Sequence, residues 1–178
     1  LRQMGSINPT HIFLPAGCGG LAAGLVSFLW KEKNESLCNL ISVESINSSC
    51  VLESIREHKP IFIDIKEETS MVGLSCGEVS EQAWKILSKT LSHSVSISDK
   101  AVAPLMKLFL DGKCGGGSIE AGECATSGAA SLLAICKEKK LKKEISLDET
   151  SIVLLIGTEG ATDIEAYNEL ISKGSLVV

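Results

Sequence analysis

A chain of 178 residues can form one domain with a sizeable core, or one lobe of a two-lobed protein. Its net charge of −5 and the lack of a basic patch with interleaved aromatic residues argue against nucleic acid as a partner. No apolar run approaches the roughly 18 residues that a membrane span needs, and the sequence shows no signal-peptide pattern. We therefore expect a cytoplasmic protein with no membrane partner.

The seven cysteines are scattered along the sequence, at positions 18, 38, 50, 76, 114, 124 and 136. They form no Cys-x-x-Cys pair, and no nearby histidine completes a zinc-ligand set. We expect free thiols in a reducing compartment and no metal site. Most are expected to be small apolar side chains that fill space in the core, although four of them, at 18, 76, 114 and 124, lie within two residues of a glycine in a predicted loop.

The first part of the chain alternates between strand and helix patterns. Residues 12–14 and 40–44 predict buried strands, and residues 21–31 predict a helix between them. Asn47 or Ser48 is the expected cap of a second helix, which stops at Pro60. Residues 1–4 resemble the last turn of a helix. Because a natural domain seldom begins inside a helical turn, this pattern favours the C-terminal part of a longer protein.

The second part predicts further strands and helices separated by glycine-rich segments. Strands are expected over 61–65, 93–97 and 151–156, and helices over 81–91, 98–110, 129–137 and 163–173, with Ser98-Asp99 and Thr126 or Ser127 as caps. The lysine-rich residues 137–143 indicate a solvated helix end. The loop over 69–78 is long and irregular, and such loops often carry function. The predicted fold is a single α/β lobe over 1–178: an open, mostly parallel sheet with helices on both faces, in three layers.

The segment from His11 to Gly24 predicts a strand, a glycine-rich loop and a helix. Glycines at 17, 19 and 20 allow consecutive backbone N–H groups to turn towards one ligand, and the following helix directs its positive end to the same point. A phosphate suits such a loop, whereas a tight turn without a ligand is the alternative. Gly122 and Gly157 also lie at junctions, and the loops at the carboxyl ends of parallel strands form ligand crevices. The alternative for Gly122 and Gly157 is that each glycine only allows a tight turn and binds no ligand.

A dinucleotide site is a rival interpretation of the same loop. Gly17, Gly19 and Ala22 fit a G-x-G-x-x-A pattern, and Glu44 closes the next predicted strand, where a ribose-binding acid is expected. Against this, a dinucleotide-binding unit usually opens its domain, and Gly20 is an extra glycine.

The motifs resemble those of fold-type II pyridoxal-phosphate (PLP) enzymes, the tryptophan synthase β class that includes serine/threonine dehydratases. Residues 9–24 are similar to the glycine loop of that class, and Val43-Glu44 to its following Val-Glu pair. Within the class the chain is most similar to diaminopropionate ammonia-lyases. That similarity is carried by the Pro-Thr-His strand start and by residues 69–78, 121–125 and 158–160, and it covers only the C-terminal half of such an enzyme.

The resemblance implies a PLP-dependent α,β-elimination that converts a 2,3-diamino acid to pyruvate and ammonia. It assigns the cofactor phosphate to the backbone of Ala16, Gly17, Cys18, Gly19, Gly20 and Leu21, and places Gly157 and Thr158 near the pyridine nitrogen. Gly157 stands where a serine is common in the class, and Ala161 where an aspartate is. The hydroxyl that contacts the ring nitrogen in the class is therefore missing, and either Thr158 or a water would take its place.

The same resemblance places the Schiff-base lysine and the substrate-carboxylate loop in the N-terminal half of the enzyme, upstream of this chain. Lys100, Lys107 and Lys113 are expected to be surface residues, so no catalytic residue is assigned within the sequence. A homodimer is implied for the full protein, and a small amino acid as its substrate. A serine/threonine dehydratase-like enzyme and a catalytically idle phosphate-binding fragment remain the alternatives.

Overall fold

The computed structural model describes residue 5, residues 7–33 and residues 38–174. Four parallel strands form one sheet in the order β3-β2-β1-β4, with bounds His11–Pro15 (β1), Asn39–Ser45 (β2), His93–Ile97 (β3) and Val153–Leu155 (β4). The helical turn expected over residues 1–4 lies outside the described residues. The parallel α/β sheet predicted from the strand and helix order is confirmed.

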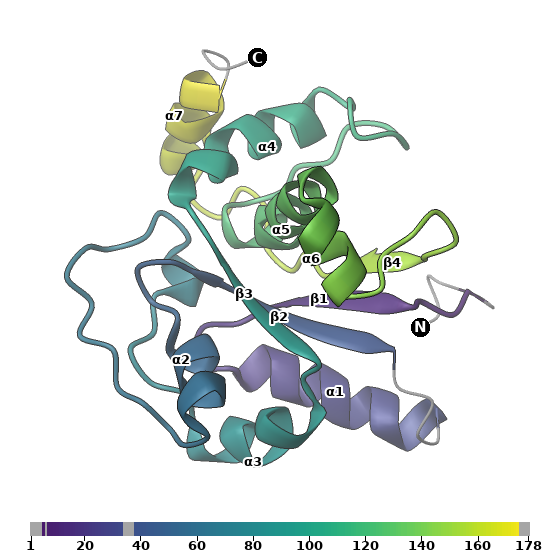
Figure 1. Ribbon diagram of the computed structural model, residues 1–178. Helices are drawn as coiled ribbons and strands as arrows, with labels where there is room; N and C mark the ends of the chain where they lie inside the picture. Colours follow the sequence, from purple (N-terminus) through teal and green to yellow (C-terminus); the bar gives the residue numbers. More distant parts are fainter. Residues whose placement is uncertain (1–4, 6, 34–37, 175–178) are drawn as a thin grey trace.

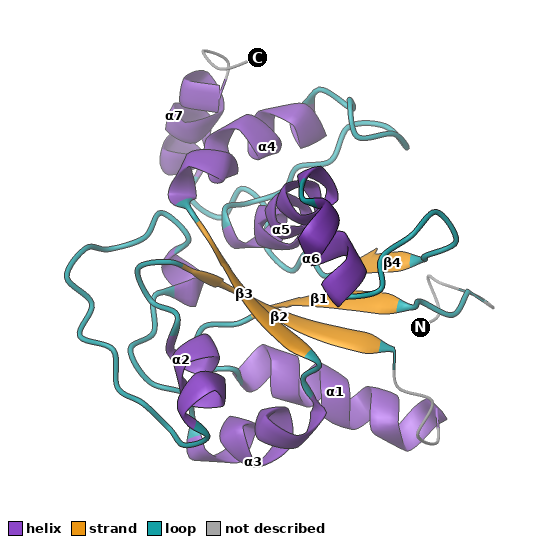
Figure 2. Cartoon of the chain, viewed as in Figure 1, coloured by secondary structure: helices purple, strands orange, loops and turns teal. Residues whose placement is uncertain are grey.

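Helices cover both faces of the sheet (Figures 1 and 2). One group is α1 (Gly20–Lys33), α2 (Cys50–Glu57) and α3 (Glu81–Thr90). The other is α4 (Val102–Leu110), α5 (Ser127–Lys137), α6 (Lys139–Glu144) and α7 (Ile164–Gly174). Short 3-10 turns, η2 (Val72–Leu74), η3 (Asp99–Ala101) and η4 (Cys124–Thr126), lie between them. In the part of the chain that the structure describes, no helix is long and apolar enough to cross a membrane.

Alternating side chains of the strands build a separate core on each face of the sheet. Ile12 and Leu14 of β1 belong to the core beneath α1, α2 and α3, whereas Phe13 belongs to the core beneath α4, α5 and α7. All five residues of β1 are buried, as expected for a parallel strand covered on both faces. This burial fixes β1 between β2 and β4, and with it the point at which the loop after Pro15 leaves the sheet.

The strand predicted over residues 61–65 is wrong. These residues are irregular, although their burial alternates, because Ile63 bonds only to Gly77 across the loop and no sheet strand lies beside them. Phe62 is 71% exposed, whereas Ile63 packs against the core beneath α1, α2 and α3, so the alternation reflects the half-buried side of an irregular segment. Strand β4 is also shorter than the predicted run over 151–156, because its register with β1 covers only Val153 to Leu155.

One predicted helix cap is wrong as well. Neither Asn47 nor Ser48 caps α2; the N-cap position is Ser49, whose side chain makes no capping bond. Thr126 does occupy the N-cap position of α5, as predicted, but the hydroxyls of Thr126 and Ser127 donate backwards to the carbonyls of Glu123 and Cys124, so neither accepts an amide of the helix. Ser98 does accept the amide of Lys100, as predicted, but at the start of η3.

Candidate functional site

The loop between β1 and α1 presents its backbone to one side. Gly19 has φ +84°, a conformation that favours glycine, and the first amides of α1 have no carbonyl partner within the helix. The first turn of α1 contains no acidic residue. The loop therefore offers N–H groups and the positive end of the helix dipole, and the first turn of the helix adds no carboxylate that would repel an anion.

The η2 segment packs tightly against this loop. A Cβ atom added at Gly17 would lie 2.8 Å from the carbonyl oxygen of Gly73 and 2.9 Å from Sγ of Cys76. The amide of Ser80 also donates to the carbonyl of Cys18, at 2.9 Å. Only glycine at position 17 permits this approach, so the irregular loop over 69–78 forms one wall of the site.

Asp99 fastens that wall to the sheet. Its Oδ1 accepts the hydroxyl of Thr69 at 2.7 Å, its Oδ2 accepts the amide of Ser70 at 2.5 Å, and Ser45 at the end of β2 donates to it at 3.4 Å. Because only Met71 separates Ser70 from η2, these hydrogen bonds to Asp99 fix the position of the chain just before η2.

The opposite wall consists of two loops that are bonded to each other. The amide of Cys124 donates to Oε2 of Glu159 at 2.6 Å, and the amide of Gly122 donates to the Glu159 carbonyl at 3.0 Å. Burial, with Glu159 close by, raises the pKa of the Cys124 thiol to about 12. The Gly122 and Gly157 junctions, which are far apart in sequence, thus lie together; Gly157 follows a parallel strand, whereas the Gly122 segment is placed by its bonds to Glu159.

These segments enclose a cavity of about 340 Å³, whose lining residues are Pro15, Gly17, Cys18, Gly19, Gly20, Leu21, Gly73, Leu74, Cys124, Thr158, Glu159 and Thr162. Six of the eight predicted site residues are among them. The other two are not: Ala16 is buried and donates its amide to Val43, and Gly157 is exposed beside the cavity-lining Thr158. The sequence did not predict the six other lining residues, although five of them lie in or directly beside the glycine-rich and irregular loops for which it predicted a function.

The chain matches the family model described as "Pyridoxal-phosphate dependent enzyme" over residues 1–157. The chain belongs to this family. Diaminopropionate ammonia-lyase from Escherichia coli K12 is 29% identical over 181 residues, which is the whole of this chain and 45% of the relative. L-serine dehydratase from Dictyostelium discoideum is 21% identical, over 92% of this chain and 45% of the relative. The chain spans less than half the length of these curated relatives.

Solved structures agree with the family assignment. A crystal structure of Escherichia coli diaminopropionate ammonia-lyase, in complex with an aminoacrylate-PLP azomethine intermediate, superposes with a TM-score of 0.84 at 30% identity. That match covers 97% of this chain and 44% of the other. A fungal L-serine ammonia-lyase from Rhizomucor miehei has a TM-score of 0.72 at 22% identity, over 97% of this chain and 52% of the other, and shows the fold alone.

The dinucleotide interpretation is wrong in its key residue. Glu44 has no exposed surface, and its two carboxylate oxygens accept the amides of Val51 and Leu52 at 2.7 Å each. A ribose-binding carboxylate must be open to its ligand, whereas this one holds the start of α2.

The family's cofactor fits the site in this chain on two observations. The loop backbone forms a cradle that a Cβ at Gly17 would disrupt, and the neighbouring cavity carries the polar side chains of Thr158, Glu159 and Thr162. Among the residues that the structure describes, no lysine lines the cavity. Lys100 and Lys113 are exposed as predicted, but Lys107 is half-buried and pairs with Asp111. The described residues therefore supply an anion cradle without an adjacent amine.

Proposed function

We propose that this chain forms the phosphate-binding part of a PLP-dependent ammonia-lyase of the diaminopropionate type. The observation that carries this proposal is the glycine loop at the start of α1, which opens into a cavity together with the 158–162 segment. The family match and the likeness to diaminopropionate ammonia-lyase support the cofactor and the reaction class. The substrate would be a 2,3-diamino acid, and the products pyruvate and ammonia.

The residues of the chain would divide the work of binding. The backbone of residues 16–21 would hold the cofactor phosphate, with Gly17 and Gly19 setting the loop shape. The loop at Gly157 and Thr158 would lie beside the ring. When bound, PLP supplies the electron-withdrawing system that stabilises negative charge at the substrate α-carbon. A part of the enzyme other than these described residues would provide the lysine that holds the cofactor.

Three further features belong to the proposal. Residues 1–178 would form a single lobe, the full protein would be a cytoplasmic homodimer, and the substrate would bind between this lobe and the remainder of the enzyme. A serine/threonine dehydratase-like activity is the second candidate, which the match to L-serine dehydratase favours. An idle phosphate-binding fragment is the third, which the lack of a cavity lysine favours.

Protection of a single thiol tests the cofactor site. Cys18 is exposed and lines the cavity, whereas Cys136 is exposed at the end of α5 and does not line it. We expect PLP and inorganic phosphate to slow alkylation of Cys18 and to leave Cys136 unchanged, with pyridoxal, which lacks the phosphate, as the control ligand. Equal alkylation of Cys18 with and without PLP would contradict the proposed site.

A turnover assay tests whether the catalytic amine comes from another part of the enzyme. We expect the purified chain, loaded with PLP and given 2,3-diaminopropionate, to form no pyruvate in a lactate dehydrogenase-coupled assay. Pyruvate formation would show that the chain contains its own catalytic amine, and would overturn the proposal that another part of the enzyme provides it.

A further inference from the structure

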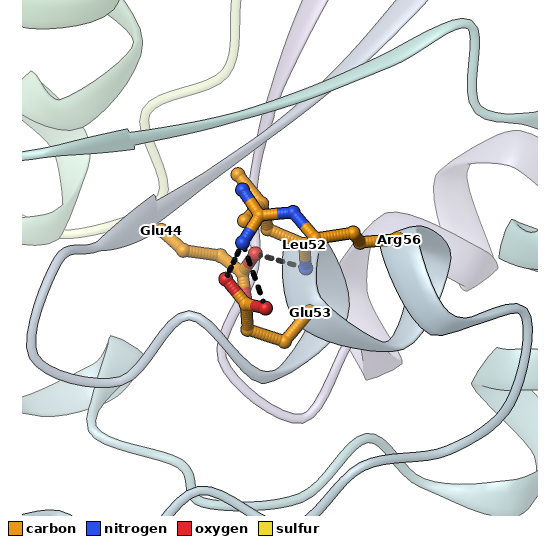
Figure 3. Close-up of polar contacts among 4 residues, drawn as sticks. All are labelled: Glu44, Leu52, Glu53 and Arg56. Carbon is orange, nitrogen blue, oxygen red and sulfur yellow. Dashed lines mark hydrogen bonds and ion pairs between the residues drawn. The ribbon is translucent and has the colours of Figure 1, made fainter.

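A buried carboxylate stands behind the glycine loop. Glu44 lies near the carboxyl end of β2 with no exposed surface, and it accepts the amides of Val51 and Leu52 at 2.7 Å each; Figure 3 shows the carboxylate directed at the start of α2. A charge removed from water needs such partners, and the first amides of a helix need acceptors. Glu44 thus replaces the side-chain cap that Ser49 does not provide.

The turn that Glu44 holds is in contact with the loop. Cys50, the first residue of α2, is fully buried and donates its thiol to the carbonyl of Gly17, with 3.5 Å between sulfur and oxygen. On the other side of Glu44 in the sequence, Val43 accepts the amide of Ala16 at 2.8 Å. The loop backbone is therefore tied at two consecutive residues to the segments that flank Glu44.

We propose that Glu44 is a positioning residue for the anion-binding loop: by fixing the first turn of α2 against Gly17, it holds the loop backbone in its ligand-binding conformation. Glu44 does not line the cavity, so it acts through Cys50 and Gly17 and not on the ligand. This inference rests on the proposed function, in which the ligand is the phosphate of PLP.

The charges around Glu44 are compatible with this role. Glu53, on the same first turn of α2, is engaged by Arg56 at 2.7 Å, which offsets its repulsion of Glu44 (Figure 3). The thiol of Cys50, whose proton is donated to Gly17, also lies close to Glu44 and partly offsets the rise that burial causes in its pKa, and burial together with Glu44 raises the pKa of Cys76. Glu44 therefore has no cationic partner among the groups that influence its pKa, and the backbone amides of Val51 and Leu52 are its main partners.

The test compares PLP affinity with thermal stability in matched variants of the purified chain. Burial raises the pKa of Glu44 to about 8, so the measurements are made at pH 8.5, where both oxygens act as acceptors. In Glu44→Gln one oxygen is replaced by an N–H donor that faces a backbone N–H. We expect the dissociation constant for PLP, measured by fluorescence, to rise about tenfold, as the loss of one or two such hydrogen bonds implies.

Ser54→Ala is the control for a purely structural effect. Ser54 is buried in the same helix, but its hydroxyl accepts the amide of Ile61 and has no bond to the glycine loop. We expect this variant to unfold at a lower temperature while its PLP affinity stays within about twofold of the wild type, the ordinary scatter for an independent site. If Glu44→Gln and Ser54→Ala weaken PLP binding equally at equal loss of stability, the positioning role is refuted.

A second pair of variants keeps the test decisive if Glu44→Gln does not fold. Cys50→Ala removes the bond to Gly17 and leaves the amide bonds of Glu44 in place, so we expect weaker PLP binding from a folded protein. Cys50→Ser retains a donor and should restore the affinity. Unchanged affinity in Cys50→Ala would overturn the inference alone, whereas a wild-type chain that does not bind PLP would overturn the proposed function and this inference with it.

Discussion

Replacing Gly17 with alanine tests the close approach on which the site depends. The added Cβ would lie 2.8 Å from the Gly73 carbonyl oxygen, 2.9 Å from Cys76 Sγ and 3.3 Å from Leu74 Cα. Two of these three atoms belong to the backbone, so rotating a side chain cannot relieve the overlap. Either the loop or η2 must move.

Overpacking of this kind costs about 1–3 kcal/mol, and one kcal/mol shifts the melting temperature of a chain of this size by roughly 2–4 °C. We therefore expect Gly17→Ala to melt several degrees below the wild type and to bind PLP more weakly, because the displaced loop no longer directs its amides to one point. Differential scanning fluorimetry, with and without PLP, measures both effects.

Gly24→Ala is the matched control. Gly24 is exposed in α1, and a Cβ there would meet nothing within 4 Å. Alanine stabilises an exposed helix interior by about 0.5–1 kcal/mol relative to glycine, so the same chemical change should raise the melting temperature at this position. If Gly17→Ala melts at or above the temperature of Gly24→Ala, the tight packing of η2 on the loop is refuted.

Three further predictions concern charges and thiols. Burial raises the pKa of the Glu44 carboxyl from 4.5 to about 8, so the folded protein binds the carboxyl proton more tightly than the unfolded chain does. The stabilisation that comes from protonated Glu44 is therefore fully present below pH 4.5 and is lost as the pH rises to about 8. Urea unfolding should therefore show stability falling between pH 5 and pH 8, and Glu44→Gln should flatten the curve; an identical slope in the variant would refute the cause. Asp99→Ala removes the acceptors of the hydrogen bonds from Thr69 and Ser70, each of which stabilises the folded state by about 1 kcal/mol. Hydrogen exchange at the amides of Ser70 and Met71 should therefore accelerate about tenfold or more, while exchange in β1 stays unchanged. Burial raises the pKa of the Cys50 and Cys124 thiols to about 12, so iodoacetamide at pH 8 should label the exposed Cys18, Cys114 and Cys136 first, which mass spectrometry of the labelled peptides measures. Early labelling of Cys124 would contradict its burial.

The parts of the fold that the sequence predicted well are those governed by local patterns. The strands β1, β2 and β3 and the helix after the glycine loop follow from apolar runs and from glycine chemistry, which need no knowledge of distant residues. The proximity of the loops at Gly17 and Gly157 followed from topology, because parallel strands bring their carboxyl ends to one edge, whereas the Gly122 segment follows no strand and is placed by its bonds to Glu159.

The errors arose where a distant residue supplied what a local one was expected to supply. The start of α2 is capped by Glu44 from the end of β2, so the local candidates Asn47 and Ser48 were wrong. Residues 61–65 alternate like a strand but pack against the 69–78 loop through Gly77. Propensity and periodicity carry no information on such contacts, because they depend on which segments the sheet brings together.

In the proposed site, the groups that bind the phosphate differ from the side chains that face the rest of the ligand. The proposed phosphate cradle consists of backbone amides, which any sequence with suitable glycines can present, so it is compatible with the low identity of 21–29% to relatives that are named for different amino-acid substrates. Beyond the β1–α1 loop, the lining residues with side chains are Leu74, Cys124, Thr158, Glu159 and Thr162. Glu159 accepts the amide of Cys124, and Cys124 is itself buried. Thr158 and Thr162 are therefore the exposed polar residues of this group that can differ in what they bind. Exchanging these two threonines should alter ligand preference in the ring-proximal part of the site and leave phosphate affinity unchanged, whereas exchanging a loop glycine should reduce phosphate affinity whatever the rest of the ligand.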